Sequence, residues 1–194
     1  SGREEPPADG FDGGIDHVSP NEIFISVDIE TAGPIPGEFS MLTIGACEAY
    51  RPDRTFECAL KPTSRNFDED ALRVTGLSLE RLGREGHEST KAMSMFAEWI
   101  HDLCKDRGTP VFVGFNAPFD WSFVNYYFHR YFGSNPFGFA ALDIKALYMG
   151  ATGCRWTETS SRQIAKKLKP RLSGDHNALH DALYQAELFQ AVRS

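Results

Sequence analysis

The sequence predicts an α/β protein with a mixed five-stranded sheet and helices on both faces. Three apolar, β-favouring segments near the start are separated only by short loops or turns, which indicates an antiparallel meander. Two further short apolar segments alternate with helical periodicity, which is typical of parallel strands joined by helices. A length of 194 residues suffices for one sizeable core. We therefore expect a single domain over 21–194.

Residues 1–20 are predicted to be a flexible acidic tail, because they are rich in Gly, Pro and Asp and poor in apolar residues. One base and five acids give the tail a charge of −4, out of −7 for the whole chain. A negative chain argues against nucleic acid as a partner. The remaining residues carry only −3, and one acidic metal site would more than account for this charge. The net charge therefore does not decide whether nucleic acid is the partner.

The chain has the composition of an ordinary soluble protein, with 41% hydrophobic and 24% charged residues. No apolar run is long enough to span a bilayer and no signal-peptide pattern opens the sequence, so we expect no membrane partner. Four widely spaced cysteines without a CxxC pair favour free thiols in a reducing environment. Together these features predict a cytoplasmic protein.

The first half of the chain supplies the meander. Residues 22–29 form an apolar first strand, followed by a Gly/Pro-rich loop over 31–39. The second strand is predicted over 41–50 and the third over 55–60, with the turn between them at 51–54.

Helical periodicity begins after the meander. Short helices are predicted over 68–73 and 78–82, and a longer one over 89–106, capped by Ser89 or Thr90. A short buried strand over 110–114 is followed by an aromatic-rich helix from Asp120 to Phe132 and a fifth strand over 139–142. Three helices complete the prediction, over 143–149, 159–168 and 176–192.

Two acidic residues, Asp28 and Glu30, interrupt the apolar first strand. Because they are two residues apart in a strand, their side chains project from the same face. Two carboxylates this close repel each other and lose hydration when buried, so burial requires a shared proton or cation. The alternative is an exposed strand end where the strand simply stops.

Three downstream residues favour the cation. Asp120 follows a buried strand, although a helix N-cap would also explain it. Asp181 lies in an otherwise apolar helix, and His176 precedes it by five residues, with an ordinary surface or core histidine as the alternative. Four converging carboxylates predict Mg²⁺ or Mn²⁺ rather than zinc. Two such ions about 4 Å apart can clamp the oxygens of a displacement at phosphorus, with a histidine accepting the proton of the attacking water.

Three motifs resemble those of the DEDDh family of 3′–5′ exonucleases, in the expected order: Val27-Asp-Ile-Glu-Thr31, Asn116-x-x-x-Asp120 and His176-x-x-x-x-Asp181. Further similarity covers about 22–192. The family includes ribonuclease T, oligoribonuclease and the proofreading subunit of the bacterial replicative polymerase. The resemblance implies a ribonuclease H-like fold and release of nucleoside 5′-monophosphates. It also implies two divalent ions on Asp28, Glu30, Asp120 and Asp181, with His176 as general base.

The sequence departs from the family pattern directly after Thr31. Ala32-Gly33-Pro34 stands where many members have Thr-Gly-Leu, so the leucine that wedges against the terminal base is missing. Three apolar residues are candidates to replace it: Ile35, Phe39 and Met41.

Substrate contacts are predicted from position and residue type. Thr31, Ala32, Asn116 and Phe119 adjoin the motifs, and Phe119 is a candidate base-stacking residue. Lys166 and Lys167 lie in a stretch without acids, 159–174, that leads to His176; a solvated basic helix face is the alternative. Part of the aromatic helix over 121–132 is a candidate homodimer surface, as the family resemblance suggests.

Single-stranded RNA is favoured over DNA, because a small stand-alone domain resembles the ribonuclease T and oligoribonuclease branches. Three alternatives remain. The chain could be a non-catalytic binding module of the same fold, a DNA proofreading subunit, or a metal phosphatase acting on small nucleotides. The first is disfavoured because all five motif residues are present.

Overall fold

The computed structural model describes residues 22–194, and the predicted tail over 1–20 lies outside them. The sheet has the order β3-β2-β1-β4-β5. β1 pairs antiparallel with β2 and parallel with β4, which confirms the predicted meander with two parallel strands. The strands are β1 (Glu22–Thr31), β2 (Met41–Glu48), β3 (Arg51–Ala59), β4 (Thr109–Gly114) and β5 (Ala141–Asp143).

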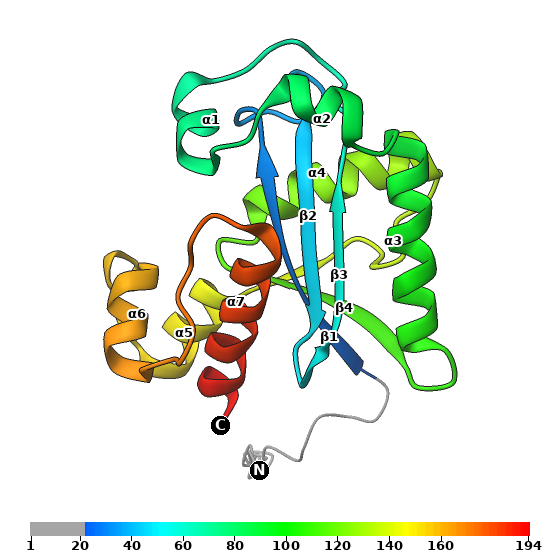
Figure 1. Cartoon of the computed structure of the whole chain (residues 1–194). Helices are drawn as coiled ribbons and strands as arrows, with labels where there is room; N and C mark the ends of the chain where they lie inside the picture. The colour runs from blue at the N-terminus through cyan, green and yellow to red at the C-terminus, as the bar shows by residue number, and fades with distance from the viewer. Residues whose placement is uncertain (1–21) are drawn as a thin grey trace, which may run out of the picture.

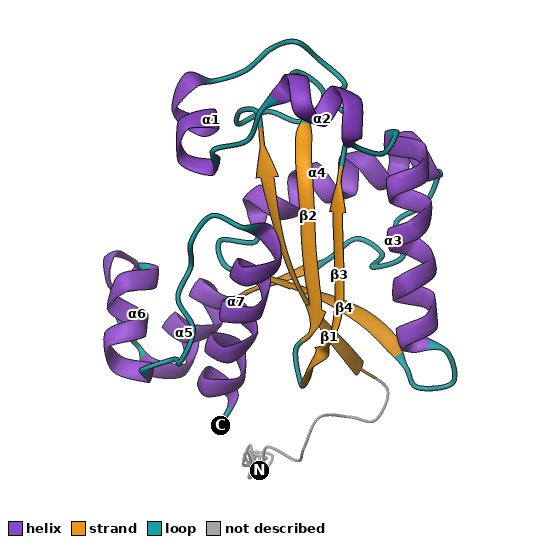
Figure 2. Cartoon of the chain, viewed as in Figure 1, coloured by secondary structure: helices purple, strands orange, loops and turns teal. Residues whose placement is uncertain are grey.

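Helices cover both faces of the sheet, as predicted (Figures 1 and 2). α3 and α4 lie on one face and α5, α6 and α7 on the other, while α1 and α2 lie beside the end of the sheet at which β1 terminates. None of the helices within residues 22–194 is long and apolar enough to cross a bilayer. The helices are α1 (Glu69–Thr75), α2 (Leu79–Glu85), α3 (Ser89–Cys104), α4 (Pro118–Tyr127), α5 (Ile144–Thr152), α6 (Ser161–Leu168) and α7 (Ala178–Arg193).

The central strand β1 is buried on both faces, which explains its nearly continuous apolar sequence. Its odd-numbered residues, such as Ile25 and Val27, pack into a core with Phe96 of α3 and Phe123 of α4. Of its even-numbered residues, Phe24 belongs to the core on the α7 face. The alternation of the strand therefore decides which side chains meet α7.

The hairpin between β2 and β3 turns earlier than predicted. The turn falls at 49–50 and β3 begins at Arg51, where the sequence indicated a turn over 51–54. The amide of Ala49 donates to the carbonyl of Phe24 at 2.8 Å, which holds the chain on the sheet up to the turn. Pro52 fits in the following strand because β3 is an edge strand, where a missing N–H is tolerated.

The aromatic segment also differs from its prediction. α4 ends at Tyr127, and 128–132 form a π-helical turn that closes at Gly133 in the left-handed region (φ 100°). Most of the aromatic residues serve the core; Tyr127, for example, is fully buried. The fifth strand covers only Ala141–Asp143, the residues that pair with β4. Phe139, where its start was predicted, is 91% exposed.

The long helix α3 begins one residue after Glu88, whose side chain makes no capping hydrogen bond. The predicted cap by Ser89 or Thr90 is therefore wrong. The Ser89 hydroxyl is buried without a hydrogen-bond partner instead. The apolar stripe of the helix packs against the sheet as its 3–4 spacing indicated, with Met93 and Phe96 fully buried.

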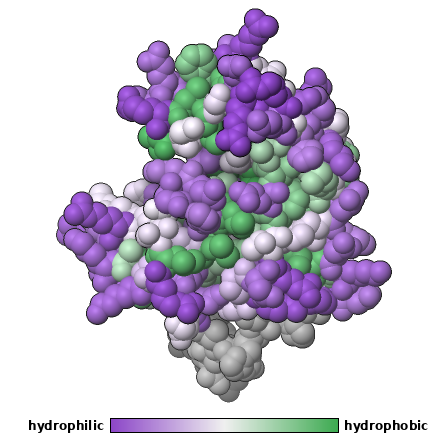
Figure 3. Space-filling model, in the orientation of Figure 1, coloured by the Kyte–Doolittle hydropathy of each residue, from purple (hydrophilic) through white to green (hydrophobic). Residues whose placement is uncertain are grey.

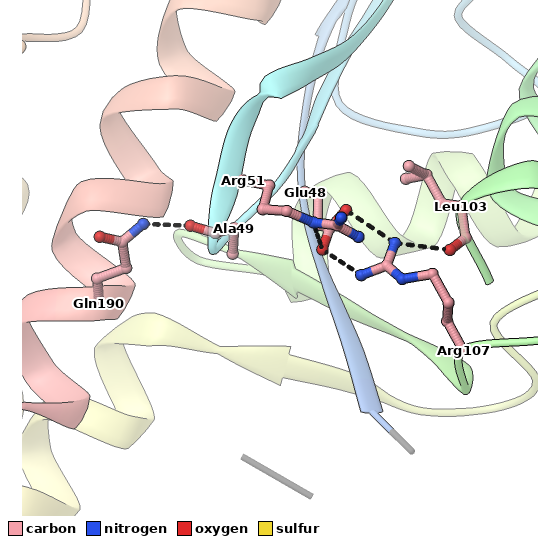
Figure 4. A network of polar contacts seen from close by, with 6 residues as sticks. All are labelled: Glu48, Ala49, Arg51, Leu103, Arg107 and Gln190. Atoms are coloured by element: carbon pink, nitrogen blue, oxygen red, sulfur yellow. Dashed lines mark hydrogen bonds and ion pairs between the residues drawn. The ribbon is translucent and has the colours of Figure 1, made fainter. Parts of the chain in front are cut away.

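An ionic network around a buried carboxylate fixes the end of the sheet opposite to the β1 carboxylates (Figure 4). The side chain of Glu48 is only 6% exposed. It accepts hydrogen bonds from Arg51 Nε at 2.9 Å and from Arg107 Nη2 at 2.8 Å. Arg107 Nη1 also donates to the carbonyl of Leu103 at 2.9 Å. The network thus ties the β2–β3 hairpin to the loop that follows α3.

We expect Arg107→Ala to lower the free energy of unfolding by about 2–3 kcal/mol, because it leaves a buried carboxylate short of a partner. Urea denaturation followed by circular dichroism measures this. The matched control is Arg81→Ala, which removes an ion pair with Glu85 that is exposed on both sides and therefore contributes little. Equal midpoints for the two variants would contradict a stabilising role for the network.

Candidate active site

The alternation of β1 brings its two acids onto the α7 face. Ser26 Oγ donates to the carbonyl of Ala182 in α7 at 2.8 Å, which fixes the helix against this face. Asp28 is the next residue on the same face, and its Oδ1 accepts from Gln185 Nε2 of α7 at 2.6 Å. Glu30 follows, near the start of α7. Their spacing in the sequence is therefore explained by the pleat.

The start of α7 packs directly on β2 at Gly45, the residue that pairs with Asp28 across the sheet. A Cβ at position 45 would lie 2.1 Å from the carbonyl carbon of Ala178 and from the amide nitrogen of Leu179. Only glycine permits this approach. The approach places Asp181, in the first turn of α7, beside the end of β1.

Asp120 reaches the site from the opposite side of β1. It lies in the first turn of α4, which begins with Pro118, and is 5% exposed. The N-cap position belongs to Ala117, so the N-cap explanation of Asp120 is wrong. Its Oδ1 instead accepts from the backbone amide of Ile29 at 3.2 Å. The carboxylate is thereby held against the strand that carries the other two acids.

Asp181 organises the loop that carries His176. Its Oδ1 accepts from the amide of Asp175 at 2.9 Å and its Oδ2 from the amide of His176 at 3.2 Å. His176 is exposed and in the left-handed region, with φ 62°. One ligand atom from each of Glu30, His176 and Asp181 lies within 4.8 Å of the other two. The structure therefore brings the predicted histidine to the predicted carboxylates.

Burial and mutual repulsion raise the pKa values of these acids. Desolvation raises the pKa of Asp28 well above its usual value, with further contributions from the charges of Asp120, Glu30 and Asp181, while the Gln185 hydrogen bond opposes the shift. Desolvation likewise raises the pKa of Glu30 to about 8, with the neighbouring acids adding to it. The pKa of Asp120 rises to about 7, again chiefly through burial. The negative charges of these carboxylates are therefore not offset by their surroundings.

The donor set fits a divalent metal. Within residues 22–194 none of the four carboxylates forms an ion pair with lysine or arginine, so a cation is the missing counter-charge. Carboxylate oxygens are the ligands preferred by hard ions such as Mg²⁺ and Mn²⁺. Asp28, Glu30, Asp120 and Asp181 are the residues that could hold such ions. They open into a pocket of about 460 Å³ lined by Asp28, Ile29, Glu30, Phe115, Asn116, Phe119, Asp120, Ser161, Gly174, His176, Asp181, Tyr184 and Gln185.

The predicted substrate contacts divide into two groups. Asn116 and Phe119 line the pocket. Thr31 and Ala32 are buried: the Thr31 hydroxyl donates to Gly33 O at 2.9 Å, and the amide of Ala32 donates to the carbonyl of Ser40. The structure does not bring these two side chains to the pocket surface.

The two predicted lysines also lie apart from the pocket lining. Lys166 and Lys167 are exposed on α6, whose first residue, Ser161, does reach the pocket. Lys167 Nζ lies 5.9 Å from the ring centroid of Tyr148. Because neither lysine lines the pocket, they could contact only a longer ligand that extends out of it.

The three candidates for the missing wedge are now distinguishable. Met41 is fully buried, and Phe39 is packed against Gly33, where a Cβ would lie 2.4 Å from the phenyl ring. Ile35 keeps half of its surface exposed in the loop that follows β1. Of the three, Ile35 is the most exposed, while Phe39 is half-buried.

Sequence reasoning missed two residues that shape the site. Gln185 bridges two elements, since its Nε2 donates to Asp28 while its Oε1 accepts from the amide of Phe115 at 3.0 Å. It is buried, and a polar residue on the apolar face of α7 was the signal that could have revealed it. The other is Gly45, which the second strand contains without any turn to require it.

The amino-acid sequence of this chain is similar to those of known exonucleases. Residues 25–189 match the family described as Exonuclease. A 3′–5′ DNA exonuclease from Escherichia coli, Cap18, is 58% identical over 171 residues, which cover 88% of this chain and 91% of that protein.

Solved structures share the fold at low identity. The nuclease domain of 3′hExo, a DEDDh family member bound to rAMP, has a TM-score of 0.69 at 16% identity, over 88% of this chain and 90% of that one. Escherichia coli Exonuclease I in complex with a dT13 oligonucleotide has a TM-score of 0.66 at 16% identity, and the match covers 86% of this chain but 40% of that one. The sequence matches show that the chain belongs to the Exonuclease family, and the solved structures, one of them a DEDDh family member, share its fold.

Proposed function

We propose that this exonuclease removes nucleotides one at a time from the 3′ end of single-stranded DNA and releases nucleoside 5′-monophosphates. The observation that carries the proposal is the cluster of four carboxylates and His176 in one pocket at the end of β1. Two divalent cations, Mg²⁺ or Mn²⁺, are the cofactors that the donor set favours.

DNA is proposed as the substrate because the relative with 58% identity is a DNA exonuclease. The sequence favoured RNA, on the ground that a small stand-alone domain resembles the ribonuclease branches of the family. Discrimination between the two depends on a partner for the terminal 2′-hydroxyl. Half-buried Glu30 and exposed Asn116 are two polar side chains of the pocket that could serve as this partner, so RNA is the alternative substrate.

The chain contributes positioning and proton transfer. A divalent cation, when bound, would stabilise the negative charge that develops on the phosphodiester. Asp28 and Glu30 project from a rigid central strand, and Gln185 orients Asp28 through a 2.6 Å hydrogen bond. His176 accepts the proton of the water that attacks phosphorus, as the bond from phosphorus to the 3′-oxygen breaks. The leaving 3′-oxygen takes a proton from solvent, so the shortened strand ends in a 3′-hydroxyl, ready for the next cycle.

We expect His176→Ala to lower kcat by about 10²–10⁴-fold, the usual contribution of a general base, with little change in thermal stability because the side chain is exposed. Single-turnover digestion of a labelled strand measures the effect. His129→Ala is the matched control, since His129 is exposed on the π-helical turn away from the pocket. A variant at position 176 with more than half of the wild-type rate would exclude it as the base.

The proposal is tested by digesting matched DNA and RNA oligomers with Mg²⁺ or Mn²⁺ and sizing the products. The expected result is a ladder of 3′-shortened DNA and free mononucleotides, with RNA degraded more slowly. Binding without cleavage would favour a non-catalytic module. Cleavage of a mononucleotide ester without cleavage of any oligomer would favour a phosphatase. A cytoplasmic location and a homodimer remain predictions from the sequence.

A further inference from the structure

One side of the pocket is built around Asp143, the last residue of β5. Its Oδ1 accepts from the amides of Asn116 at 2.9 Å and Ala117 at 3.2 Å, in the loop after β4. The same carboxylate caps α5 through the amides of Lys145 and Ala146, both at 3.3 Å. The loop that carries Asn116 and the first turn of α5 are therefore fixed to each other.

This arrangement holds a lysine and a tryptophan at the rim of the pocket. Lys145 Nζ lies 3.3 Å from Asn116 Oδ1, and Asn116 lines the pocket. The same nitrogen lies 4.4 Å from the ring centroid of Trp156, which is 51% exposed. Within residues 22–194 no carboxylate pairs with Lys145. A cation and an aromatic face are thus presented together next to an acidic pocket.

Neither side chain is required by the core. The indole of Trp156 keeps half of its surface in water and belongs to none of the hydrophobic clusters of the described residues, and a lysine without an acidic partner gains little from ion pairing. Their chemistry is that of single-strand recognition, in which a cation contacts the phosphate and an aromatic ring stacks on the base. A strand that enters the pocket with its 3′ end also meets four carboxylates, so a cation beside the entrance offsets repulsion of the next phosphate.

We propose that Lys145 and Trp156 bind the nucleotide on the 5′ side of the one that is removed, with the ammonium group on its phosphate and the indole on its base. The inference rests on the proposed exonuclease function. The strand would continue over α6, where Figure 3 shows hydrophilic residues, because the stretch 159–174 contains bases and no acid. Lys166 and Lys167 would then contact nucleotides farther from the 3′ end.

The test compares a substrate that reaches this rim with one that does not. Lys145→Ala and Trp156→Ala are assayed on a DNA oligomer and on the p-nitrophenyl ester of thymidine 5′-monophosphate, which occupies only the pocket. We expect the ratio of kcat/KM for the oligomer to that for the ester to fall about tenfold in each variant. Lys91→Ala, on α3, and Phe139→Ala, an exposed aromatic residue outside the pocket lining, are the matched controls and should keep the wild-type ratio.

Salt dependence separates the two roles. Loss of one phosphate contact in Lys145→Ala should reduce the slope of log(kcat/KM) for the oligomer against log salt by about 0.7, and Lys145→Arg should restore it. Trp156→Ala should leave the slope unchanged. An unchanged oligomer-to-ester ratio in both variants would overturn the inference, and so would an equal loss on both substrates, which would indicate a structural role. A wild-type protein that cleaves neither substrate would instead refute the proposed function.

Discussion

Asp28→Asn is expected to abolish exonuclease activity and, at the same time, to make the metal-free protein more stable. The carboxylate is desolvated and faces the charges of Asp120, Glu30 and Asp181, which together raise its pKa. Asparagine keeps an oxygen that accepts the hydrogen bond from Gln185 but carries no charge. The loss of activity should be at least about a thousandfold, since several kcal/mol of charge stabilisation depend on the missing ligand.

The gain in stability has a defined pH dependence. In the wild type the pKa of Glu30 is about 8 and that of Asp120 about 7, both above their usual values. The folded protein therefore holds more protons than the unfolded chain from about pH 4 to 8, and the stability of the metal-free protein falls as the pH rises through this range. The pKa of Asp28 is raised as well, so its carboxylate adds to this loss of stability, and asparagine removes that contribution. The advantage of Asp28→Asn over wild type should grow from pH 5 to pH 8.

Thermal unfolding with EDTA, and again with Mn²⁺, measures both effects. Without metal the variant should unfold at a higher temperature than the wild type. The corresponding gain in unfolding free energy should be about 1–3 kcal/mol at pH 8. Saturating Mn²⁺ at about 100 times its Kd should stabilise the wild type by about 2.7 kcal/mol and the variant much less. Asp102→Asn, an exposed acid on α3, is the control. A metal-free variant less stable than wild type would contradict the electrostatic account of the cluster.

The part of this site that lies on β1 could be predicted from the sequence, because strand periodicity is a local property. Two acids that lie two residues apart in a strand share one face of the sheet, whatever the remaining structure. The antiparallel meander was predictable for a similar reason, since short connections leave few topologies. The convergence of Asp120 with these acids was expected from its motif. The contact that holds it was not predictable, because the hydrogen bond from Ile29 to its side chain joins residues 91 positions apart.

The differences between the predicted and the observed structure have a common cause. The hairpin turn was placed at 51–54 by its turn-forming residues, but a hydrogen bond from Ala49 to Phe24 on the neighbouring strand decides where the chain leaves the sheet. Thr31 and Ala32 adjoin the first motif, but the loop after β1 folds back and buries their side chains, so position in the sequence does not show which side chains reach the pocket. In each case a tertiary contact overrides a local preference, and a local pattern contains no information about that contact.

Gly45→Ala is the second substitution expected to have a large effect, and it tests how α7 comes to complete the site. The added Cβ would lie 2.1 Å from two backbone atoms of α7, and no side-chain rotation can relieve a clash with backbone. We expect a loss of more than about 3 kcal/mol of unfolding free energy, at the upper end of what overpacking costs. Chemical denaturation measures this loss, with Gly150→Ala as the control.

Gly150 lies in α5 with no atom within 4 Å of an added Cβ, so alanine there should stabilise the protein by about 0.5–1 kcal/mol. Two glycine-to-alanine changes of opposite sign separate the effect of contact with α7 from the general effect of removing a glycine. Wild-type stability in Gly45→Ala would mean that α7 can move away at no cost.

The catalytic consequence of Gly45→Ala follows from what α7 carries. The first two turns of the helix present Asp181 and Gln185 to Asp28, and Asp181 also holds the amide of His176. A helix displaced from β2 would move the metal ligand, the residue that orients Asp28 and the predicted base together. Activity in the folded fraction should therefore fall by more than the loss of folded protein accounts for, whereas Arg107→Ala, which acts at the other end of the sheet, should lower stability without this loss. The comparison of these two variants separates site geometry from stability, because a sheet that is merely less stable still holds its helix at the same distance.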